Sequence, residues 1–448
     1  MRLALPAVGE QVLSLMVGIV NTMLVGHLSA EALTAVGLSS TITGMAHIFV
    51  SAVGTGTTAL VAQAVGAEKP ALATRTMEQA MMLAIALGFL VAVILIPLAP
   101  VTLALMGAEG ATVDMGVTYL RLVAASLPLS VLMFVGNAAL RGAGDTRSPM
   151  VVMSAVNLLN AALSYTLIRG TGPLPELGVT GAGIAAGVST AAGGLAVMTT
   201  LLSGKAALRL RRPFNRPDRA LLANLMRVGL PAGGESILMH GAFLAYARSI
   251  SSLGTVAYAA YLIGQRIESL NSMPAQGFAI ASTTLSGQSF GAGDPARARR
   301  SVFASIRLAL GLAAVCSALS LGIPHVLLSL FTDDAAVITQ GIPVVRVVAF
   351  AQPLMSLAFC LAGGLRGAGD TRSVMTITGI SAWCVRVPLA VLSVTVFNLG
   401  LVGVQTSMML DWLSRCIMLG WRFRPVAWEQ RAAKLSRELV TATVDQVP

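Results

Sequence analysis

Long apolar stretches alternate with short polar ones along almost the whole chain. An apolar run of about 20 residues is long enough to cross the hydrocarbon core of a bilayer as a helix. The runs lie at 4–26, 33–62, 77–103, 116–140, 149–169, 179–203, 226–250, 256–287, 301–330, 340–364, 374–397 and 400–421. This pattern predicts an all-α polytopic membrane protein with twelve transmembrane helices.

One long polar stretch interrupts the pattern near the middle of the chain. Residues 204–224 are rich in arginine and carry two prolines, which is typical of a linker. We therefore expect an N-terminal six-helix lobe at 1–203, a cytoplasmic linker at 204–224, a C-terminal six-helix lobe at 225–421 and a cytoplasmic tail at 422–448.

The two predicted lobes repeat each other at a constant spacing of 225 positions. LRGAGDTRS at 140–148 recurs at 365–373, and LPAVGE at 5–10 corresponds to LPAGGE at 230–235. Each lobe has an even number of helices, so both enter the membrane in the same sense and form a parallel repeat. Two such bundles, related by an axis along the membrane normal, are expected to enclose a central cleft that opens to alternate sides.

Composition and charge support a membrane protein and indicate its orientation. The chain is 55% hydrophobic and 11% charged, whereas soluble domains carry about 25% charged residues. Its net charge is +11, and the basic residues gather in every second connection between helices, which places both termini in the cytoplasm. We expect a multi-pass protein of the bacterial inner membrane that contacts anionic lipid. No basic face is interleaved with aromatic residues, so nucleic acid is not an expected partner.

Motifs of common membrane enzymes and pumps are absent from the sequence. There is no GxxxxGK[ST] for a nucleotide and no HExxH for a metal, and the four cysteines form no CxxC. The sequence therefore predicts no enzyme, no metal site and no cofactor other than a coupling ion.

Four acidic residues lie inside the apolar runs, where ionisable groups are costly and usually functional. Glu10 and Glu235 are repeat equivalents, each four residues after a proline expected to start a helix. They are candidates for cation coupling, or alternatively for structural pairing with an arginine. Glu268 is a third candidate, and Asp411 a fourth, although Arg415 at i+4 also predicts an ion pair within the helix.

Uncharged polar residues in the same runs are candidates for substrate binding. In the second lobe, Glu268 lies in a polar segment, and Gln265 at i−3 shares its helix face. Membrane Asn and Gln also commonly hold helices together, so both roles stay open. The candidate substrate-binding residues are Asn21, Gln63, Asn157 and Asn160 in the first lobe and Gln265, Arg266 and Asn271 in the second.

The paired LRGAGDTRS loops, LPAVGE with LPAGGE, and NTMLVGHLSAEALTAVGL after the first helix resemble the multidrug and toxic compound extrusion (MATE) family. The resemblance covers residues 1–421 and implies a V-shaped, two-lobe fold that exports cationic or amphiphilic compounds against an inward flow of H⁺ or Na⁺. The sequence departs from the family pattern at its acidic positions. Asn21, Ser164 and Met355 stand where many members carry acidic or amide residues, which leaves the coupling ion open.

Together these observations favour a monomeric secondary antiporter that exports small organic compounds in exchange for H⁺, or for Na⁺. Protons are favoured because the candidate groups are isolated Glu residues and not a cluster of oxygen ligands. The main alternative is a flippase for lipid-linked precursors, which predicts that Arg248, Arg266 and Arg386 converge on the cleft. A channel or a membrane enzyme is disfavoured.

Overall fold

The computed structural model describes residues 3–26, 28–170, 176–204, 207–210, 216–424 and 428–430. Part of the predicted linker, with Lys205, Arg211 and Arg212, lies outside the described residues. The same holds for most of the predicted tail, with Arg431, Lys434 and Arg437.

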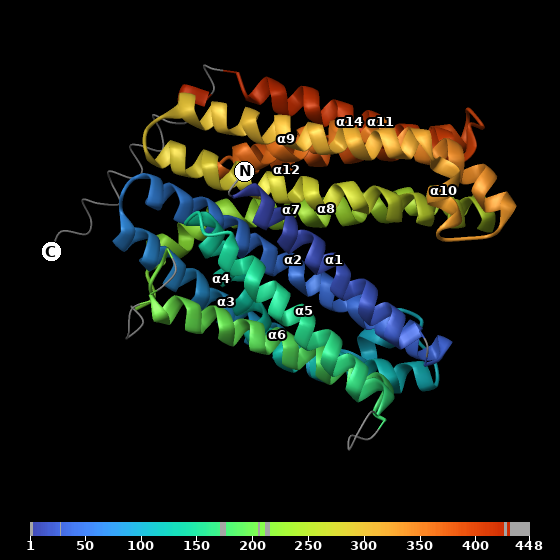
Figure 1. Cartoon of the computed structure of the whole chain (residues 1–448), viewed down its shortest axis with the longest axis horizontal. Coiled ribbons are helices and arrows are strands. Elements are labelled where there is room, and N and C mark those ends of the chain that lie inside the picture. Colours follow the sequence, from blue (N-terminus) through green and yellow to red (C-terminus); the bar gives the residue numbers. More distant parts are fainter. Residues whose placement is uncertain are drawn as a thin grey trace. The chain divides into compact units, whose positions relative to one another are not determined.

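The described residues form long helices throughout, in two compact units (Figure 1). Unit 1 comprises Met1–Val65 and Lys69–Leu230, and unit 2 comprises Gly66–Glu68 and Pro231–Pro448. The first six helices are α1 (Ala4–Gly26), α2 (Ala30–Gly66), α3 (Pro70–Leu105), α4 (Ala111–Gly142), α5 (Arg147–Arg169) and α6 (Gly178–Ser203). The helix α7 (Arg219–Ser251) contains the division between the units at Leu230 and Pro231.

The remaining helices belong to unit 2 apart from the start of α7. They are α8 (Thr255–Gly291), α9 (Pro295–Gly322), α10 (Pro324–Ser329), α11 (Ala335–Gly367), α12 (Thr371–Ile380), the π-helix η1 (Ser381–Arg386), α13 (Val387–Thr395) and α14 (Gly400–Arg422). α12, η1 and α13 are continuous and together make one span, Thr371–Thr395. If that span is counted once and the six-residue α10 is left out, the described residues form six long helices in each predicted lobe. This confirms the predicted fold class.

Three details differ from the sequence prediction. The run predicted at 301–330 is broken after Gly322, because Pro324 has no N–H to continue the helix and instead starts α10. The segment at Ser381–Arg386 is a π-helix, which hydropathy cannot reveal. Pro231 does not start a helix as predicted; it lies inside α7, twelve residues after Arg219. Pro6 does lie in the first turn of its helix.

Eight of the described helical segments are long and apolar enough to cross a membrane by length and composition alone. Among the rods below that threshold are α7, α8 and α14, whose sequences carry charged residues within the helix. The polarity that weakens the hydropathy signal is therefore concentrated in three helices of unit 2. These helices carry most of the site described below.

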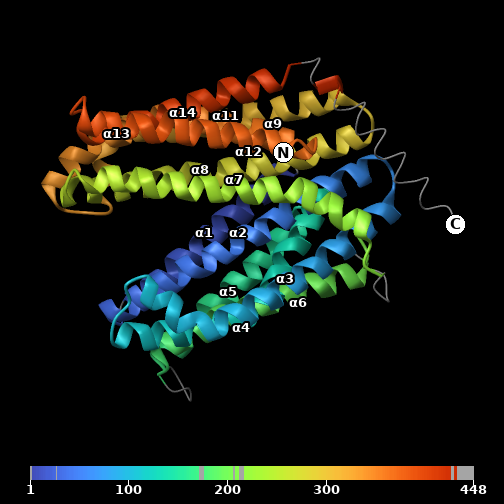
Figure 2. The same cartoon turned by 180° about the vertical axis from the view of Figure 1, so that it is seen from behind.

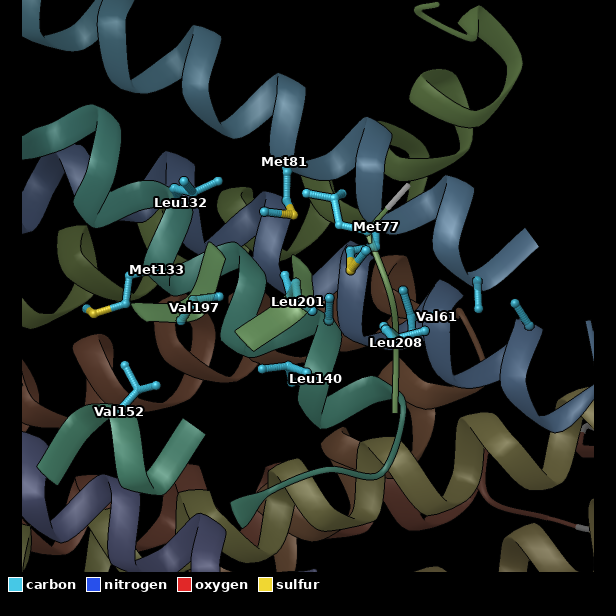
Figure 3. Close-up of a cluster of buried hydrophobic side chains, with 14 of the residues drawn as sticks. Val61, Met77, Met81, Leu132, Met133, Leu140, Val152, Val197, Leu201 and Leu208 are labelled. Atoms are coloured by element: carbon cyan, nitrogen blue, oxygen red, sulfur yellow. The ribbon is translucent and has the colours of Figure 1, made fainter. Parts of the chain in front are cut away.

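A close-packed apolar cluster holds the helices of unit 1 together. Met77 and Met81 of α3 meet Leu132 and Leu140 of α4, and Leu201 of α6 joins them (Figure 3). Leu208 and Leu210, which follow α6 in the linker, are buried in the same cluster. The linker therefore begins as part of the core of unit 1.

In unit 2, α8 and α11 make the most extensive helix–helix contact, and α9 and α14 also pack on α11 (Figure 2). The glycine Gly367 at the end of α11 explains how closely α8 approaches. A Cβ at Gly367 would lie 2.3 Å from the carbonyl oxygen of Thr283 in α8. Gly142 of α4, its repeat equivalent, meets the Thr58 carbonyl of α2 in the same way, at 2.7 Å. The repeat thus extends to the contacts that set helix spacing.

The two LRGAGDTRS loops form matching turns. Gly144 and Gly369 have positive φ, at +90° and +79°, which glycine adopts without steric cost. Asp145 accepts hydrogen bonds from the N–H groups of the first turn of α5, and Asp370 accepts one from the Ser373 N–H of α12. These contacts satisfy N–H groups that have no partner within the helix.

Candidate functional site

Each repeat contains one carboxylate on its first helix, buried in unit 1 and half-buried in unit 2, that is paired with the arginine of its LRGAGDTRS motif. In unit 1 the Glu10 Oε1 of α1 lies 2.6 Å from the Arg141 Nη1 of α4, and both side chains are less than 10% exposed. In unit 2 the Arg366 Nη2 of α11 donates to both oxygens of Glu235 at 2.8 Å. Both carboxylates are therefore engaged by a cation.

The two pairs differ in their remaining hydrogen bonds. Glu235 also accepts a hydrogen bond from Thr378 Oγ1 at 3.1 Å. The Oε2 of Glu10 is buried and accepts no hydrogen bond. Within the described residues, Glu10 thus retains one free acceptor oxygen, whereas Glu235 accepts three hydrogen bonds from two side chains.

A buried ion network in unit 2 surrounds Asp411 of α14. Its carboxylate lies 3.0 Å from Arg386 Nη2 of η1 and accepts hydrogen bonds from Arg415 Nε at 3.0 Å and Arg415 Nη2 at 2.9 Å. Ser381, at the start of η1, donates a further hydrogen bond. The i, i+4 pair with Arg415 expected from the sequence is present. Arg386 was not expected as a partner, because it approaches only through the fold.

Two tyrosines connect this network with Glu268. The Arg386 guanidinium lies over the Tyr246 ring of α7, 5.6 Å from its centre. Tyr246 lies 5.9 Å from the ring of Tyr261 in α8, and Gln265 donates to the Tyr261 hydroxyl at 3.3 Å. Gln265 and Glu268 share the face of α8 that carries Tyr261, as their spacing predicts. Arg386 also lies within electrostatic range of Glu268.

We name this set the second-lobe polar network. It comprises Tyr246, Tyr261, Gln265, Glu268, Arg386, Asp411 and Arg415. Within the described residues, no ion pair involves Glu268, in contrast to Glu10, Glu235 and Asp411. Glu268 is half-buried, so among the four candidate coupling acids its carboxylate is the one left open to another ligand within the described residues.

Two predicted substrate residues of α8 are not part of this network. The Arg266 side chain is exposed on another side of the helix from Gln265, so the predicted grouping of these polar residues on one site is only partly observed. Asn271 is buried, and its Nδ2 has no hydrogen-bond partner. Arg248, one of the arginines expected to converge in a flippase, is exposed near the end of α7.

The first-lobe candidates lie mainly between α1 and α5. Asn157 Nδ2 donates to the Leu13 carbonyl at 2.7 Å, and Ser164 Oγ donates to Asn21 Oδ1 at 3.2 Å. Asn160 lies between Asn157 and Ser164 on the same stripe of α5 and is buried. This interface is polar and uncharged. Amide and hydroxyl groups of this interface can form hydrogen bonds with a ligand, and some of them already form the hydrogen bonds that hold α1 and α5 together.

Gln63 lies on α2 and does not belong to the interface between α1 and α5. It is buried in the last turn of α2. Its repeat equivalent, 225 positions later, is Gln288 in α8.

Glu78 in α3 was missing from the sequence-derived candidates. It is fully buried, as is the neighbouring Gln79. Gln79 holds the linker by donating to the Arg216 carbonyl at 3.0 Å and accepting from the Asp218 N–H at 2.9 Å. Glu78 is the second residue of the predicted run 77–103, so its position inside that run was the signal that could have identified it.

Comparison with known proteins gives the family. The MatE family profile matches residues 6–166 and 231–392, one segment in each repeat. The chain belongs to the MatE family. It is 32% identical over 440 residues to the probable multidrug resistance protein NorM of Thermotoga maritima, covering 98% of this chain and 94% of that protein. It is 30% identical over 399 residues to the multidrug resistance protein PmpM of Pseudomonas aeruginosa, covering 87% and 82%.

Solved structures agree with the MatE fold. A crystal structure of MATE in the bent conformation superimposes with a TM-score of 0.89 at 23% identity, over 96% of both chains. An outward-facing multidrug resistance MATE family transporter superimposes with a TM-score of 0.88 at 23% identity, over 97% of this chain and 95% of that one. The MatE chain described here is therefore a multi-pass membrane transporter and not an enzyme.

Proposed function

We propose that this MatE transporter exports small cationic or amphiphilic organic compounds in exchange for protons. Its relatives NorM and PmpM are named as multidrug resistance proteins, which supports export of organic compounds. We propose that it is a monomer of the bacterial inner membrane. The alternation of basic connections along the sequence supports cytoplasmic positions for both termini.

We assign the coupling role to Glu268, on one observation. Of the four candidate acids, it is the one without an ion pair in the described part of the chain. A carboxylate held by an arginine strongly favours its charged form, so it exchanges protons poorly near neutral pH. A carboxylate without such a partner can bind either a proton or a cationic ligand. Glu10, Glu235 and Asp411 are better suited to holding helices together.

The proposed cycle uses the second-lobe polar network. Deprotonated Glu268 holds the positive group of the substrate by charge attraction. Protonation of Glu268 from the outside removes the attraction and releases the substrate. Arg386 lies within range of Glu268 but is retained by Asp411, so it does not take the place of the substrate.

The first lobe is proposed to contact the polar parts of the substrate without coupling it. Asn21, Asn157 and Asn160 offer hydrogen bonds but no charge, which fits a binding role. Their neutral oxygens are also the ligands that Na⁺ accepts, so Na⁺ is the alternative coupling ion. We do not propose the flippase function, because Arg386 is paired with Asp411 whereas Arg248 and Arg266 are exposed.

Purified protein in proteoliposomes tests this proposal. Dye efflux is measured under a proton gradient alone, a sodium gradient alone, and neither. We expect efflux only with the proton gradient, and its loss in Glu268→Gln. The control Glu109→Gln removes an exposed acid outside the network and is expected to transport normally. Efflux that continues unchanged without either gradient would refute coupled transport.

A further inference from the structure

A basic recess lies at the start of α9 in unit 2. Its volume is about 470 Å³, and its lining includes Arg299, Arg300, Phe303 and Arg307 of α9. Trp428, which follows α14, forms another wall together with Glu429. The recess is distinct from the second-lobe polar network and shares no residue with it.

Positive charge dominates this recess. Three arginines line it against a single acid, Glu429. Arg300 and Arg307 are exposed, and neither forms an ion pair within the described residues. The Nε of Arg299 is buried without a hydrogen-bond partner, while its guanidinium lies over the Phe303 ring at 5.6 Å. The site therefore has donors available and an excess of two positive charges.

The acids nearby do not neutralise the recess. Asp294 caps α9 by accepting a hydrogen bond from the Arg297 N–H at 2.7 Å, and its side chain does not line the recess. Glu429 is exposed. The chemistry that complements this lining is an anion with several acceptor oxygens, and a phosphate group fits because arginine binds it through paired N–H donors.

The wall formed by Trp428 is fixed by the fold. Trp428 is 2% exposed and donates from Nε1 to the Pro295 carbonyl at 2.8 Å. Its ring packs against Phe290 and Phe423, with centroid distances of 4.7 Å and 4.3 Å. The recess is therefore built before any ligand enters.

The surroundings of the recess favour a lipid over a soluble anion. α9 continues from the arginines into an apolar stretch in which 28% of an 18-residue window is buried, so apolar side chains of this helix are left uncovered by the described chain. Phe303 is 41% exposed and lies between Arg300 and Arg307 on the same helix face. A phospholipid placed with its phosphate in the recess can lay its acyl chains along this apolar surface.

The first repeat has a recess at the equivalent place, with fewer charged residues in the part of its lining that the structure describes. That recess is about 970 Å³ in volume and is lined by Pro70, Ala71 and Thr74, which lie 225 positions before Pro295, Ala296 and Arg299. Arg209 is the one charged residue among the described residues of its lining. Arg75, the equivalent of Arg300, is instead paired with Asp218 at 2.9 Å.

We propose that the recess formed by Arg299, Arg300 and Arg307 binds the phosphate of an anionic phospholipid from the leaflet that faces the basic connections. The recess of the first repeat begins at the equivalent helix start but has one arginine among its described lining residues, so it serves as a comparison within the same chain. Binding there stabilises the contact between the start of α9 and the segment at Trp428.

The full-length protein in detergent tests this by native mass spectrometry with phosphatidylglycerol and phosphatidylcholine. We expect wild type to bind phosphatidylglycerol in preference, and R299Q/R300Q/R307Q to bind it about 100-fold more weakly. The control R209Q/R297Q/R372Q removes three arginines outside the recess and is expected to stay within about threefold of wild type. R300Q alone is expected to weaken binding of phosphatidylglycerol about fivefold. This single variant can be compared with wild type if the triple variant does not fold.

Three results would overturn the proposal. The first is equal retention of phosphatidylglycerol by wild type and the R299Q/R300Q/R307Q variant. The second is equal binding of phosphatidylcholine and phosphatidylglycerol by wild type. The third is displacement of the lipid by millimolar inorganic phosphate, which would assign the site to a soluble anion.

Discussion

Replacing Asp411 with asparagine keeps the shape of the side chain but removes its charge. Arg386 and Arg415, both 5% exposed, would then be buried without their counter-ion. Removing one partner of a buried ion pair costs about 3–5 kcal/mol, because the remaining charge is left uncompensated. The hydrogen bond from Ser381 can persist to the asparagine oxygen, so the loss is mainly electrostatic. We therefore expect Asp411→Asn to lower the melting temperature by roughly 6–20 °C.

The matched comparison is Glu268→Gln, which also removes one negative charge from the second-lobe polar network. Glu268 has no ion pair within the described residues, so no partner is stranded by its loss. We expect its stability to stay within about 1 kcal/mol of wild type. Thermal unfolding in detergent, followed by intrinsic fluorescence, measures both variants. Equal melting temperatures for the two variants would show that the division between structural and coupling acids is wrong.

Three further predictions concern the Glu10–Arg141 ion pair, two glycines and Tyr261. Reversing Glu10 to Arg, or Arg141 to Glu, is expected to destabilise unit 1, and combining both is expected to recover about 2 kcal/mol in a double-mutant cycle of unfolding free energies. Additive losses would mean that the pair contributes nothing. Gly144→Ala is expected to lower the free energy of unfolding by about 1 kcal/mol, because Gly144 has a positive φ. Gly37 lies on a helix with open space around it, so Gly37→Ala is expected to raise the free energy of unfolding by about 1 kcal/mol. A change of the same sign for both variants in chemical unfolding would contradict this prediction. Tyr261→Phe removes the buried hydroxyl that accepts a hydrogen bond from Gln265 and is expected to lower the free energy of unfolding by about 1 kcal/mol. An unchanged free energy of unfolding would show that this hydrogen bond contributes nothing to stability.

Much of the fold could be predicted because membrane spanning imposes a length and a polarity on each helix. The constant spacing of 225 positions identified equivalent residues, such as Gly142 and Gly367, that then pack in the same way. Local pairs were also accessible, since Asp411 and Arg415 are one helical turn apart. These features depend on near neighbours or on repetition.

Features that depend on the three-dimensional approach of distant segments could not be predicted. Glu10 and Arg141 are 131 positions apart, and nothing in either local sequence identifies the other as its partner. Arg386 reaches Asp411 from a π-helix that hydropathy treats as ordinary helix. The sequence therefore predicted four candidate coupling acids without ranking them, and only their contacts in the structure distinguish Glu268 from the other three.

If Glu268 carries the proton that is exchanged for substrate, binding of a cationic substrate must displace that proton. Proton release on addition of substrate is measured with purified protein in weakly buffered detergent. We expect release of about one proton per bound cationic substrate in wild type and in Glu109→Gln, and no release in folded Glu268→Gln. The same proton release from Glu268→Gln as from wild type would show that another group carries the proton.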